Sequence, residues 1–385
     1  MKTILKTLLL SVMTITSLSC NANENANKKT STALAEVKIH ESTQQYIKVA
    51  LLLDTSNSMD GLIDQAKAQL WDIVNELSYA KCGNEKPKLE IALYEYGNDN
   101  LNSREGYIRQ VLGFSDDLDE ISKQLFSLTT NGGNEYCGHV IQSAVNQLSW
   151  GNNPDDLKFI FIAGNEPYTQ GSVNYQMASK LALDNDVTVN TIFCGDYNLG
   201  ISTYWKEGAD LAHGDYMAIN HNKATTYVST PFDDQILNLN QQLNNTYIAY
   251  GSLGQTKMEL QSQQDDNAKG YSSENAVSRT VSKSSHLYKN ATWDLVDAAQ
   301  EKDFDFKSID KKDLPKNLQG KTAEEVEAYI SKKSEERKSI QYQIQTLNQK
   351  RRDYIIGQHK NDESRLDNAM IKAIKTQAKA KKYKW

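Results

Sequence analysis

Six apolar runs separated by amphipathic segments constrain the fold of this chain more than any other feature. The first, Tyr46–Leu53 (YIKVALLL), is apolar over most of its length, as a strand buried on both faces should be. The other runs lie at Leu89–Tyr96, Tyr107–Leu112, Leu157–Ala163, Val187–Cys194 and, more weakly, Asp215–Ile219. Between them, helical spacing predicts helices at Leu62–Leu77, Leu118–Leu128, Tyr136–Leu148, Tyr175–Leu183 and Thr203–Ala212. This alternation predicts an α/β fold, a doubly wound, mostly parallel six-stranded sheet with helices on both faces.

The chain beyond the last strand is predicted to be helical. Phe232–Tyr250 has helical apolar spacing and is expected to close an α/β domain at residues 45–250. Residues 251–320 are expected to form a polar connector region, in which residues 251–285 are either helix or linker. A long helix and a basic helical tail are expected at residues 321–385.

The long helix is predicted to begin at a capping box, Thr322-x-x-Glu325. Its apolar residues have the spacing of a coiled coil, but Lys333, Arg337 and Arg351 interrupt the apolar seam. We therefore expect this helix to pack on its own chain, or in a hairpin with Glu363–Lys382, and we favour a monomer.

The first twenty residues have the pattern of an export signal. Lys2 and Lys6 precede an apolar stretch that is too short to span a bilayer. The sequence Ser17-Leu18-Ser19-Cys20 resembles a bacterial lipoprotein cleavage box, in which Cys20 would carry the lipid; ordinary cleavage near Ala22 is the alternative. Residues 21–44 are polar and are expected to be a tether. The protein is therefore expected in the periplasm or at the cell surface, anchored to a membrane if Cys20 is lipidated.

Charge is unevenly distributed along the chain. The net charge is −6, which excludes simple electrostatic binding of nucleic acid by the whole molecule. Residues 350–385 nevertheless contain eleven Lys and Arg against four Asp and Glu. This basic tail could contact anionic lipid, an acidic partner or the body of the protein, or be a solvated helix end.

A cluster of oxygen-bearing side chains follows the first predicted strand. Asp54, Ser56 and Ser58 alternate on a short loop, and ligands of parallel sheets bind beyond the carboxyl ends of the strands. Hydroxyl and carboxylate oxygens suit a hard divalent cation, Mg²⁺ first and Ca²⁺ or Mn²⁺ as alternatives. The competing interpretation is that these residues only cap the following helix.

Residues 46–250 resemble the von Willebrand factor type A (VWA) domain. Asp54-x-Ser56-x-Ser58 resembles the first loop of its metal-ion-dependent adhesion site, and Tyr204–Tyr216 is similar to the helix that leads into its last strand. The resemblance implies two further loops, one with a threonine after a Gly-Gly turn and one with an aspartate after the fourth strand. Here Asn134 stands at the threonine position and Gly164 at the aspartate position.

The side chains beside these two positions keep oxygen ligands available. Asn134 and Glu135 could complete the site from the second loop, and Asn165 or Glu166 from the third. The resemblance implies that an acidic side chain of a protein partner fills an open position on the cation. A direct Glu135 or Glu166 ligand would lower the charge that attracts such a partner.

Motifs of common enzymes are missing from the sequence. It contains no phosphate-binding G-x-x-x-x-G-K-[ST], no G-x-S-x-G and no H-E-x-x-H, so we expect a binding protein rather than an enzyme. Two alternatives stay open: a metal-free assembly scaffold that acts through its helical tail, and a metal-assisted hydrolase built around Glu135 and Glu166.

Two cysteines are predicted to lie at the same edge of the sheet. Cys137 follows the Gly-Gly turn and Cys194 ends the fifth predicted strand. Because an exported protein can oxidise its thiols, we predict a Cys137–Cys194 disulfide, with Cys82 free or an alternative partner. The other interpretation of Cys194 is an inert buried thiol.

Overall fold

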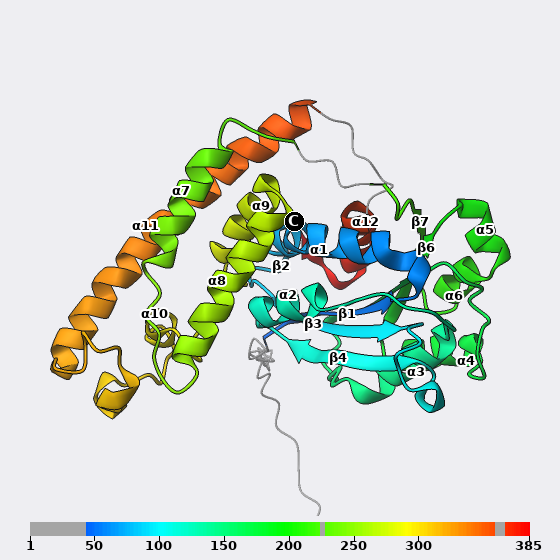
Figure 1. Cartoon of the computed structure of the whole chain (residues 1–385), viewed down its shortest axis with the longest axis horizontal. Coiled ribbons are helices and arrows are strands. Elements are labelled where there is room, and N and C mark those ends of the chain that lie inside the picture. Colours follow the sequence, from blue (N-terminus) through cyan, green and yellow to red (C-terminus); the bar gives the residue numbers. More distant parts are fainter. Residues whose placement is uncertain (1–43, 224–227, 359–365) are drawn as a thin grey trace, which may run out of the picture. The chain divides into compact units, whose positions relative to one another are not determined.

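A computed structural model of the chain describes residues 44–223, 228–358 and 366–385. Its centre is a six-stranded sheet with the strand order β4-β3-β1-β5-β6-β7 (Figure 1). The strands are β1 (Tyr46–Asp54), β3 (Lys88–Tyr96), β4 (Ile108–Ser115), β5 (Leu157–Gly164), β6 (Thr188–Cys194) and β7 (Tyr216–Ile219). All neighbours are parallel except β3 and β4, which are antiparallel. The predicted mostly parallel sheet is confirmed.

Different helices cover the two faces of the sheet, as Figure 1 shows for α1 and α3. Successive side chains of a strand point to opposite faces, so Leu51 of β1 packs in one core and Leu52 in the other. The first core includes α1, α2 and α12 (Leu366–Ala378), and the second includes α3, α4 and α6. The helices between the strands are α1 (Asp60–Leu77), α2 (Leu118–Phe126), α3 (Cys137–Gln147), α4 (Tyr175–Asp184), α5 (Tyr197–Ser202) and α6 (Trp205–Asp210).

The C-terminal part of the described chain is helical, as predicted. Its helices are α7 (Asp233–Asn244), α8 (Gly254–Tyr271), α9 (Ser273–Lys283), α10 (Leu295–Ala298), α11 (Ala323–Gln358) and α12 (Leu366–Ala378). Residues 251–285, for which helix and linker were both open, contain two helices. Short 3-10 helices lie at Asn57–Met59, Ser103–Glu105, Phe306–Ser308, Lys311–Asp313 and Lys379–Lys381, and β2 (Lys81–Cys82) pairs antiparallel with β8 (Tyr383–Lys384).

Helix α11 begins at the predicted capping box. Thr322 N donates to Glu325 Oε2 (2.8 Å), and Glu325 N donates to Thr322 Oγ1 (3.3 Å). The helix packs on its own chain, against α7, α9 and α10. Its seam arginines are part of that packing, because Arg337 pairs with Asp294 and Arg351 with Asp233. The predicted hairpin partner, α12, packs mainly on α1 instead.

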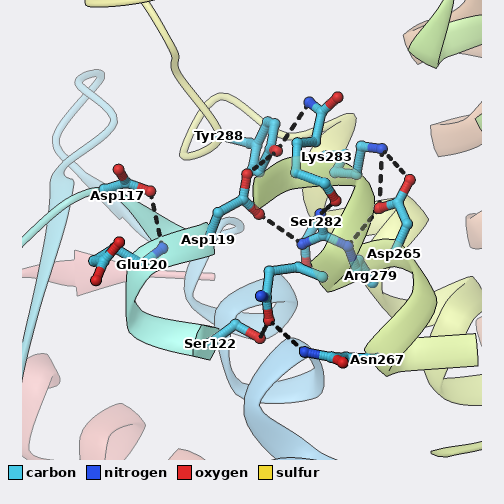
Figure 2. A network of polar contacts seen from close by, with 12 residues as sticks. Asp117, Asp119, Glu120, Ser122, Asp265, Asn267, Arg279, Ser282, Lys283 and Tyr288 are labelled. Atoms are coloured by element: carbon cyan, nitrogen blue, oxygen red, sulfur yellow. Dashed lines mark hydrogen bonds and ion pairs between the residues drawn. The ribbon is translucent and has the colours of Figure 1, made fainter. Parts of the chain in front are cut away.

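A buried polar network joins α2 to helices α8 and α9 (Figure 2). Arg279 of α9 donates from Nη1 to Asp119 of α2 (2.8 Å) and from Nε to Asp265 of α8 (2.5 Å). Lys283 Nζ lies 2.8 Å from Asp265, and Tyr288 Oη donates to Asp119 (2.6 Å). Because both cations are almost fully buried, the network fixes how the helical region is fastened to the α/β part.

The described residues from Gln44 to Trp385 form one compact unit. Several side chains of the basic tail contact the body of the protein: Lys381 pairs with Asp186 and Lys375 with Glu76. The domain bounds drawn from the sequence stay predictions. In the described part, no helix is both apolar enough and long enough to cross a bilayer. The predicted signal peptide, tether and Cys20 lie outside the described residues.

The predicted disulfide between Cys137 and Cys194 is absent, and both are free, buried thiols. Cys137 belongs to the core on the α3 face, whereas Cys194 belongs to the core on the α1 face. Their side chains therefore lie on opposite faces of the sheet although both are near one edge. Burial raises the pKa of both thiols well above the usual value, which keeps them protonated and unreactive.

Candidate functional site

Three loops meet at the carboxyl end of β1. The loop after Asp54 is tied to the segment that precedes α3, because Asn57 N donates to Gly132 O (2.7 Å) and Asn131 N to Thr55 O (3.0 Å). The turn after β3 joins the same segment through Asp99 N, which donates to Asn131 O (3.1 Å). These backbone hydrogen bonds hold segments that are far apart in the sequence at one point of the sheet edge.

Asp54, the last residue of β1, is fully buried. Its Oδ1 accepts a hydrogen bond from Ser56 N (2.7 Å). Its Oδ2 is buried, and none of the described residues supplies it with a hydrogen-bond donor. A buried carboxylate oxygen without a partner is costly, so this atom is one that a bound cation would satisfy.

Two serine hydroxyls and an amide lie between Asp54 and the solvent, and we call these side chains together with Asp54 the group. Ser56 Oγ lies 3.2 Å from Ser58 Oγ. Ser58 Oγ in turn lies 3.1 Å from Asn165 Nδ2 and 3.4 Å from Asn165 Oδ1. Asn165 follows β5, so this contact brings the third predicted loop to the first.

Glu135 places a second buried carboxyl group beside Asp54. Burial, followed by the charge of Glu135, raises the pKa of Asp54 well above its usual value. Burial also raises the pKa of Glu135. Lysine and arginine are not among the main causes of either shift. Two acidic groups without a basic partner make a site that favours either a proton or a cation.

Two glycines leave the space that these side chains need. Gly97 has φ +79°, and a Cβ there would lie 2.7 Å from Asp54 Oδ1 and 2.9 Å from Glu135 Cγ. A Cβ at Gly164 would lie 2.5 Å from Tyr96 Oη and 3.3 Å from Asp54 Cβ. The aspartate expected at position 164 therefore has no room here, and the oxygen-bearing side chain comes from Asn165.

The structure brings together most of the residues predicted from the sequence. They are Asp54, Ser56, Ser58, Glu135 and Asn165. Glu166 lies at the margin: its backbone N donates to Glu135 Oε2 (3.3 Å), and its side chain accepts from Gln170 Nε2 (3.1 Å). Asn134 is exposed, and no hydrogen bond found among the described residues connects it to the group.

The alternative that Asp54, Ser56 and Ser58 only cap a helix is not favoured by the geometry. Neither Ser56, which precedes the 3-10 helix, nor Met59, which precedes α1, makes a side-chain capping hydrogen bond. Instead, Asp54 Oδ1 accepts from Ser56 N, the hydroxyls of Ser56 and Ser58 contact each other, and Ser58 Oγ accepts from Asn165 Nδ2 in the loop after β5.

Asp99 and Gln170 were missed by the sequence reasoning. The carboxyl group of Asp99 packs against the Gly-Gly turn, where a Cβ at Gly133 would lie 2.5 Å from its Oδ1. Gln170 Oε1 accepts from Glu135 N (3.1 Å) and so orients the residue that carries the second carboxyl group. Asp99 could have been found, because it comes three residues after the end of β3.

The donor set fits a hard divalent cation. It combines the free oxygen of Asp54, the Glu135 carboxylate, two hydroxyls and an amide, all oxygen ligands of the kind that Mg²⁺ and Ca²⁺ take. Residues 44–223, 228–358 and 366–385 contain no group of three or more His, Cys, Asp and Glu side chains arranged to hold a metal ion. Hydroxyl and amide oxygens thus supply much of this candidate site.

Comparison with known families gives one match. Residues 48–242 match the model of the von Willebrand factor type A domain, which is half of the chain. No curated protein matches the chain.

Solved structures with similar folds share little sequence with this chain. The conserved hypothetical protein BatB from Bacteroides thetaiotaomicron is 15% identical, with a TM-score of 0.35 over 45% of this chain and 90% of its own. The SpRpn10 VWA domain is 19% identical, with a TM-score of 0.33 over 45% and 87%. Proximal thread matrix protein 1 from the mussel byssus is 14% identical, with a TM-score of 0.35 over 46% and 42%. At these values the similarities carry no argument about function.

Proposed function

The chain belongs to the von Willebrand factor type A domain family, and we propose that it is a protein-binding module that depends on a divalent cation. Domains of this family are typically binding or adhesion modules rather than enzymes. The proposed cation is Mg²⁺, with Ca²⁺ or Mn²⁺ as alternatives, and the proposed partner is a protein that offers an acidic side chain.

Asp54, Ser56, Ser58, Glu135 and Asn165 would hold the cation. When bound, it would supply a positive charge that attracts a carboxylate of the partner. Asp54 and Glu135 would hold it from the buried side, whereas Ser58 and Asn165 lie on the exposed side and leave access for a partner. Because two carboxylates would neutralise much of its charge, we expect weaker attraction of an acidic partner than one carboxylate would allow.

The main support for this proposal is the environment of the Asp54 carboxyl group. Its buried Oδ2 has no partner among the described residues, and its nearest charged neighbour is another acid. Without a cation, this arrangement costs stability, because the buried carboxyl groups must share protons or repel each other.

We further propose that the module is exported and tethered to a membrane through a lipid on Cys20. The support is the sequence pattern of residues 1–20 and the polar segment that follows. Mass spectrometry of the mature N-terminus tests this directly: a diacylated Cys20 is expected, and an unmodified start at Asn23 refutes it.

Calorimetric titration with Mg²⁺ tests the binding site. We expect saturable heat with the full chain, at least tenfold weaker affinity in Ser56→Ala, and no measurable binding in Asp54→Asn. Titrations with Ca²⁺ and Mn²⁺ then rank the three cations. Absence of heat with all three cations discards the metal-dependent mechanism and favours the metal-free scaffold. Heat that is unchanged by both substitutions places the cation elsewhere in the molecule.

A further inference from the structure

Four exposed lysines gather where the C-terminal strand β8 pairs with β2. Lys81 lies on β2 and Lys384 on β8, while Lys379 and Lys382 lie in and directly after the 3-10 helix that precedes β8. We call these four residues the basic end; the C-terminus marks its place beside β2 in Figure 1. In the part of the chain that the structure describes, none of the four is paired with an acidic side chain. The basic end is therefore a surface of uncompensated positive charge.

Two of these lysines repel each other across the strand pair. Lys81 and Lys384 stand directly opposite in the antiparallel β2–β8 pair. Residues in such positions point to the same face with their Cβ atoms about 5 Å apart, so like charges there destabilise the pairing. The neighbouring pair, Cys82 and Tyr383, points to the other face, and Tyr383 is only 3% exposed. Both ammonium groups therefore lie side by side on the solvent face, where a bound anion would relieve their repulsion.

The basic end is fixed beside the point where the chain enters the fold. Tyr46, the first residue of β1, donates from N to Asp156 Oδ1 (2.8 Å). Lys381 Nζ donates to Asp156 O (2.7 Å), and Tyr383 Oη donates to Asp155 O (3.0 Å). The turn before β5 thus holds both the start of β1 and the segment that carries the lysines. Any anchor that precedes β1 in the sequence is covalently attached at this end of the molecule.

Charge at this end is positive overall. Lys86 and Lys88 are also exposed, and Lys88 N donates to Gln45 O (2.9 Å), which places them at the chain entry. Two exposed acidic residues, Glu85 and Asp155, lie beside the basic end. With the four lysines of the basic end, six exposed lysines therefore stand against two exposed acids.

The candidate cation site lies at the opposite end of the same strand. β1 runs from Tyr46 to Asp54, and eight steps of about 3.3 Å put its two ends about 26 Å apart. A flat surface that contacts the basic end therefore leaves the cation site directed away from it and accessible to a partner.

We propose that the basic end is a membrane-contact surface that binds the anionic head groups of phospholipids. This inference deepens the proposed lipid anchor and rests on it, because the anchor brings this end of the molecule to the bilayer. The anchor alone would fix the module at a membrane, whereas the lysine contacts would also fix its orientation, with the cation site outward. Each lysine near an anionic surface contributes on the order of a fivefold gain in binding.

The surface chemistry favours lipid over a protein partner. Trp385, next to Lys384, is 37% exposed, and partly exposed tryptophan is typical of the head-group level of a membrane. Protein interfaces have instead an apolar core. Here the apolar side chains of β2 and β8, those of Cys82 and Tyr383, belong to the core of the molecule.

Co-sedimentation with lipid vesicles tests the proposal. The protein is the lipid-free chain of residues 21–385, which contains the whole compact unit of residues 44–385. The vesicles consist of phosphatidylcholine, with or without phosphatidylglycerol. In low salt we expect binding to the anionic vesicles only, and release of the protein at about 0.5 M NaCl, which screens the charges. Equal binding to both kinds of vesicle, or no binding to either, overturns the proposal.

Charge reversal at the opposed lysines is the decisive substitution. Lys81→Glu/Lys384→Glu should weaken binding to anionic vesicles about tenfold or more. The single variant Lys81→Glu turns a repulsive pair into an attractive one, so it should bind vesicles more weakly but unfold at the same or a higher urea concentration. Lower stability of this variant would show that the two lysines do not repel each other, which removes the argument for a bound anion and overturns the proposal.

The matched control is Lys332→Glu/Lys338→Glu. Both lysines are exposed on α11, have no acidic partner among the described residues and lie outside the basic end. The control changes the net charge as much as Lys81→Glu/Lys384→Glu does, and it should bind anionic vesicles as the unmodified chain does. Equal losses in the two double variants would trace binding to net charge and refute the proposal.

Two further measurements separate other ligands and the anchor. Soluble polyaspartate or a single-stranded oligonucleotide that binds more tightly than the vesicles do, and is lost in Lys81→Glu/Lys384→Glu, would assign the basic end to an acidic protein or a nucleic acid and refute the proposal. Mass spectrometry of the mature N-terminus tests the anchor separately. An unmodified start at Asn23 overturns the proposed anchor, whereas a diacylated Cys20 without anionic-vesicle binding of the lipid-free chain overturns the basic-end proposal alone.

Discussion

Asn134 and Glu135 are neighbours in the chain, but they have opposite environments. Asn134 is exposed, whereas Glu135 is buried beside Asp54. We expect Glu135→Gln to weaken Mg²⁺ binding at least tenfold, because a neutral amide replaces a charged ligand. The same change should raise the free energy of unfolding of the metal-free protein by about 1 kcal/mol, because it removes a buried acid.

Asn134→Ala is the matched control for this prediction. It should leave both Mg²⁺ affinity and stability unchanged in calorimetry and thermal denaturation. If Asn134→Ala weakens Mg²⁺ binding as much as Glu135→Gln does, the second loop contributes through the position expected from family resemblance, and our assignment is wrong.

Gly97 and Gly251 allow crowding and backbone strain to be separated. Both have positive φ, +79° and +73°, but a Cβ at Gly251 has nothing within 4 Å. Each alanine substitution should cost about 1 kcal/mol of strain. Only Gly97→Ala should cost a further ~1–3 kcal/mol and impair Mg²⁺ binding, since its Cβ crowds Asp54 and Glu135. Urea denaturation and Mg²⁺ titration measure both effects, and equal losses of stability would show that the space around Asp54 is not critical.

His286 should make stability depend on pH. Burial, with the charges of Lys86 and Lys289, lowers the pKa of His286 to about 4. Between pH 6.5 and 4 the unfolded chain therefore binds a proton that the folded protein does not, so stability falls as pH falls through this window. His286→Gln should flatten the difference between Tm at pH 6.5 and at pH 4.5. Unchanged pH dependence in this variant would mean that the folded protein also accepts the proton.

In the network between α2, α8 and α9, the carboxylate of Asp265 pairs with both buried cations, Arg279 and Lys283 (Figure 2). Burial would raise its pKa, but the charges of Lys283 and Arg279 hold the pKa of Asp265 well below its usual value. Asp265→Asn leaves two buried cations with less compensation and should cost about 3–5 kcal/mol. Because the pKa of Asp265 is lower in the folded protein than in the unfolded chain, its carboxylate stabilises the fold at pH values above the pKa of the unfolded chain. This contribution is lost on acidification, so the cost of Asp265→Asn should shrink below about pH 4.

Asp266→Asn is the matched control for the network. Asp266 is the next residue of α8 and is exposed. It should change the free energy of unfolding by less than about 0.5 kcal/mol in urea denaturation. A similar loss for both variants would indicate that helix propensity or net charge, and not the buried network, explains the effect.

Prediction from the sequence succeeded where burial gives a continuous apolar signal. The strands β1, β3, β5 and β6 are buried on both faces and were predicted to within one or two residues. Helix α8 gave no clear signal because its buried face includes Gln261 and Gln264, which form hydrogen bonds with Tyr288 and with Ser122 of α2. The antiparallel direction of β4 also has no local signature in its residues.

The candidate site was predictable as far as it lies in one contiguous loop. Asp54, Ser56 and Ser58 are close in sequence, and their position after a buried strand was sufficient to predict that they form part of one site. Whether Asn134 or Glu135 turns inward depends on contacts with Gln170 and Glu166, which no local pattern encodes. The disulfide prediction failed for a related reason, because the sheet edge was inferred correctly but the face on which each thiol lies was not.

At the scale of the whole molecule, α1 is enclosed on two sides. It packs on the sheet and also contacts α9 and α12. Trp71 is fully buried, with the Arg279 guanidinium 4.8 Å from its ring centre, and Asn275 Nδ2 donates to Ala68 O (2.5 Å). Residues of α9, α11 and α12 thus complete a core that begins in the α/β part.

We therefore expect a chain that ends at Tyr250 not to reach a stable folded state alone. Removing α9, α11 and α12 exposes the side of α1 that carries Trp71 and takes away core residues such as Val277, Ile344 and Ile374. Each buried apolar side chain contributes roughly 1.5–3 kcal/mol, so the loss is comparable with a typical net stability of about 5–15 kcal/mol. The shortened chain should bind the dye ANS, be digested rapidly by trypsin and show no cooperative thermal transition, whereas adding residues 251–385 as a separate fragment should restore protection. Cooperative unfolding of the shortened chain near the Tm of the full chain would contradict this prediction and would make the helical region an accessory to an independent domain.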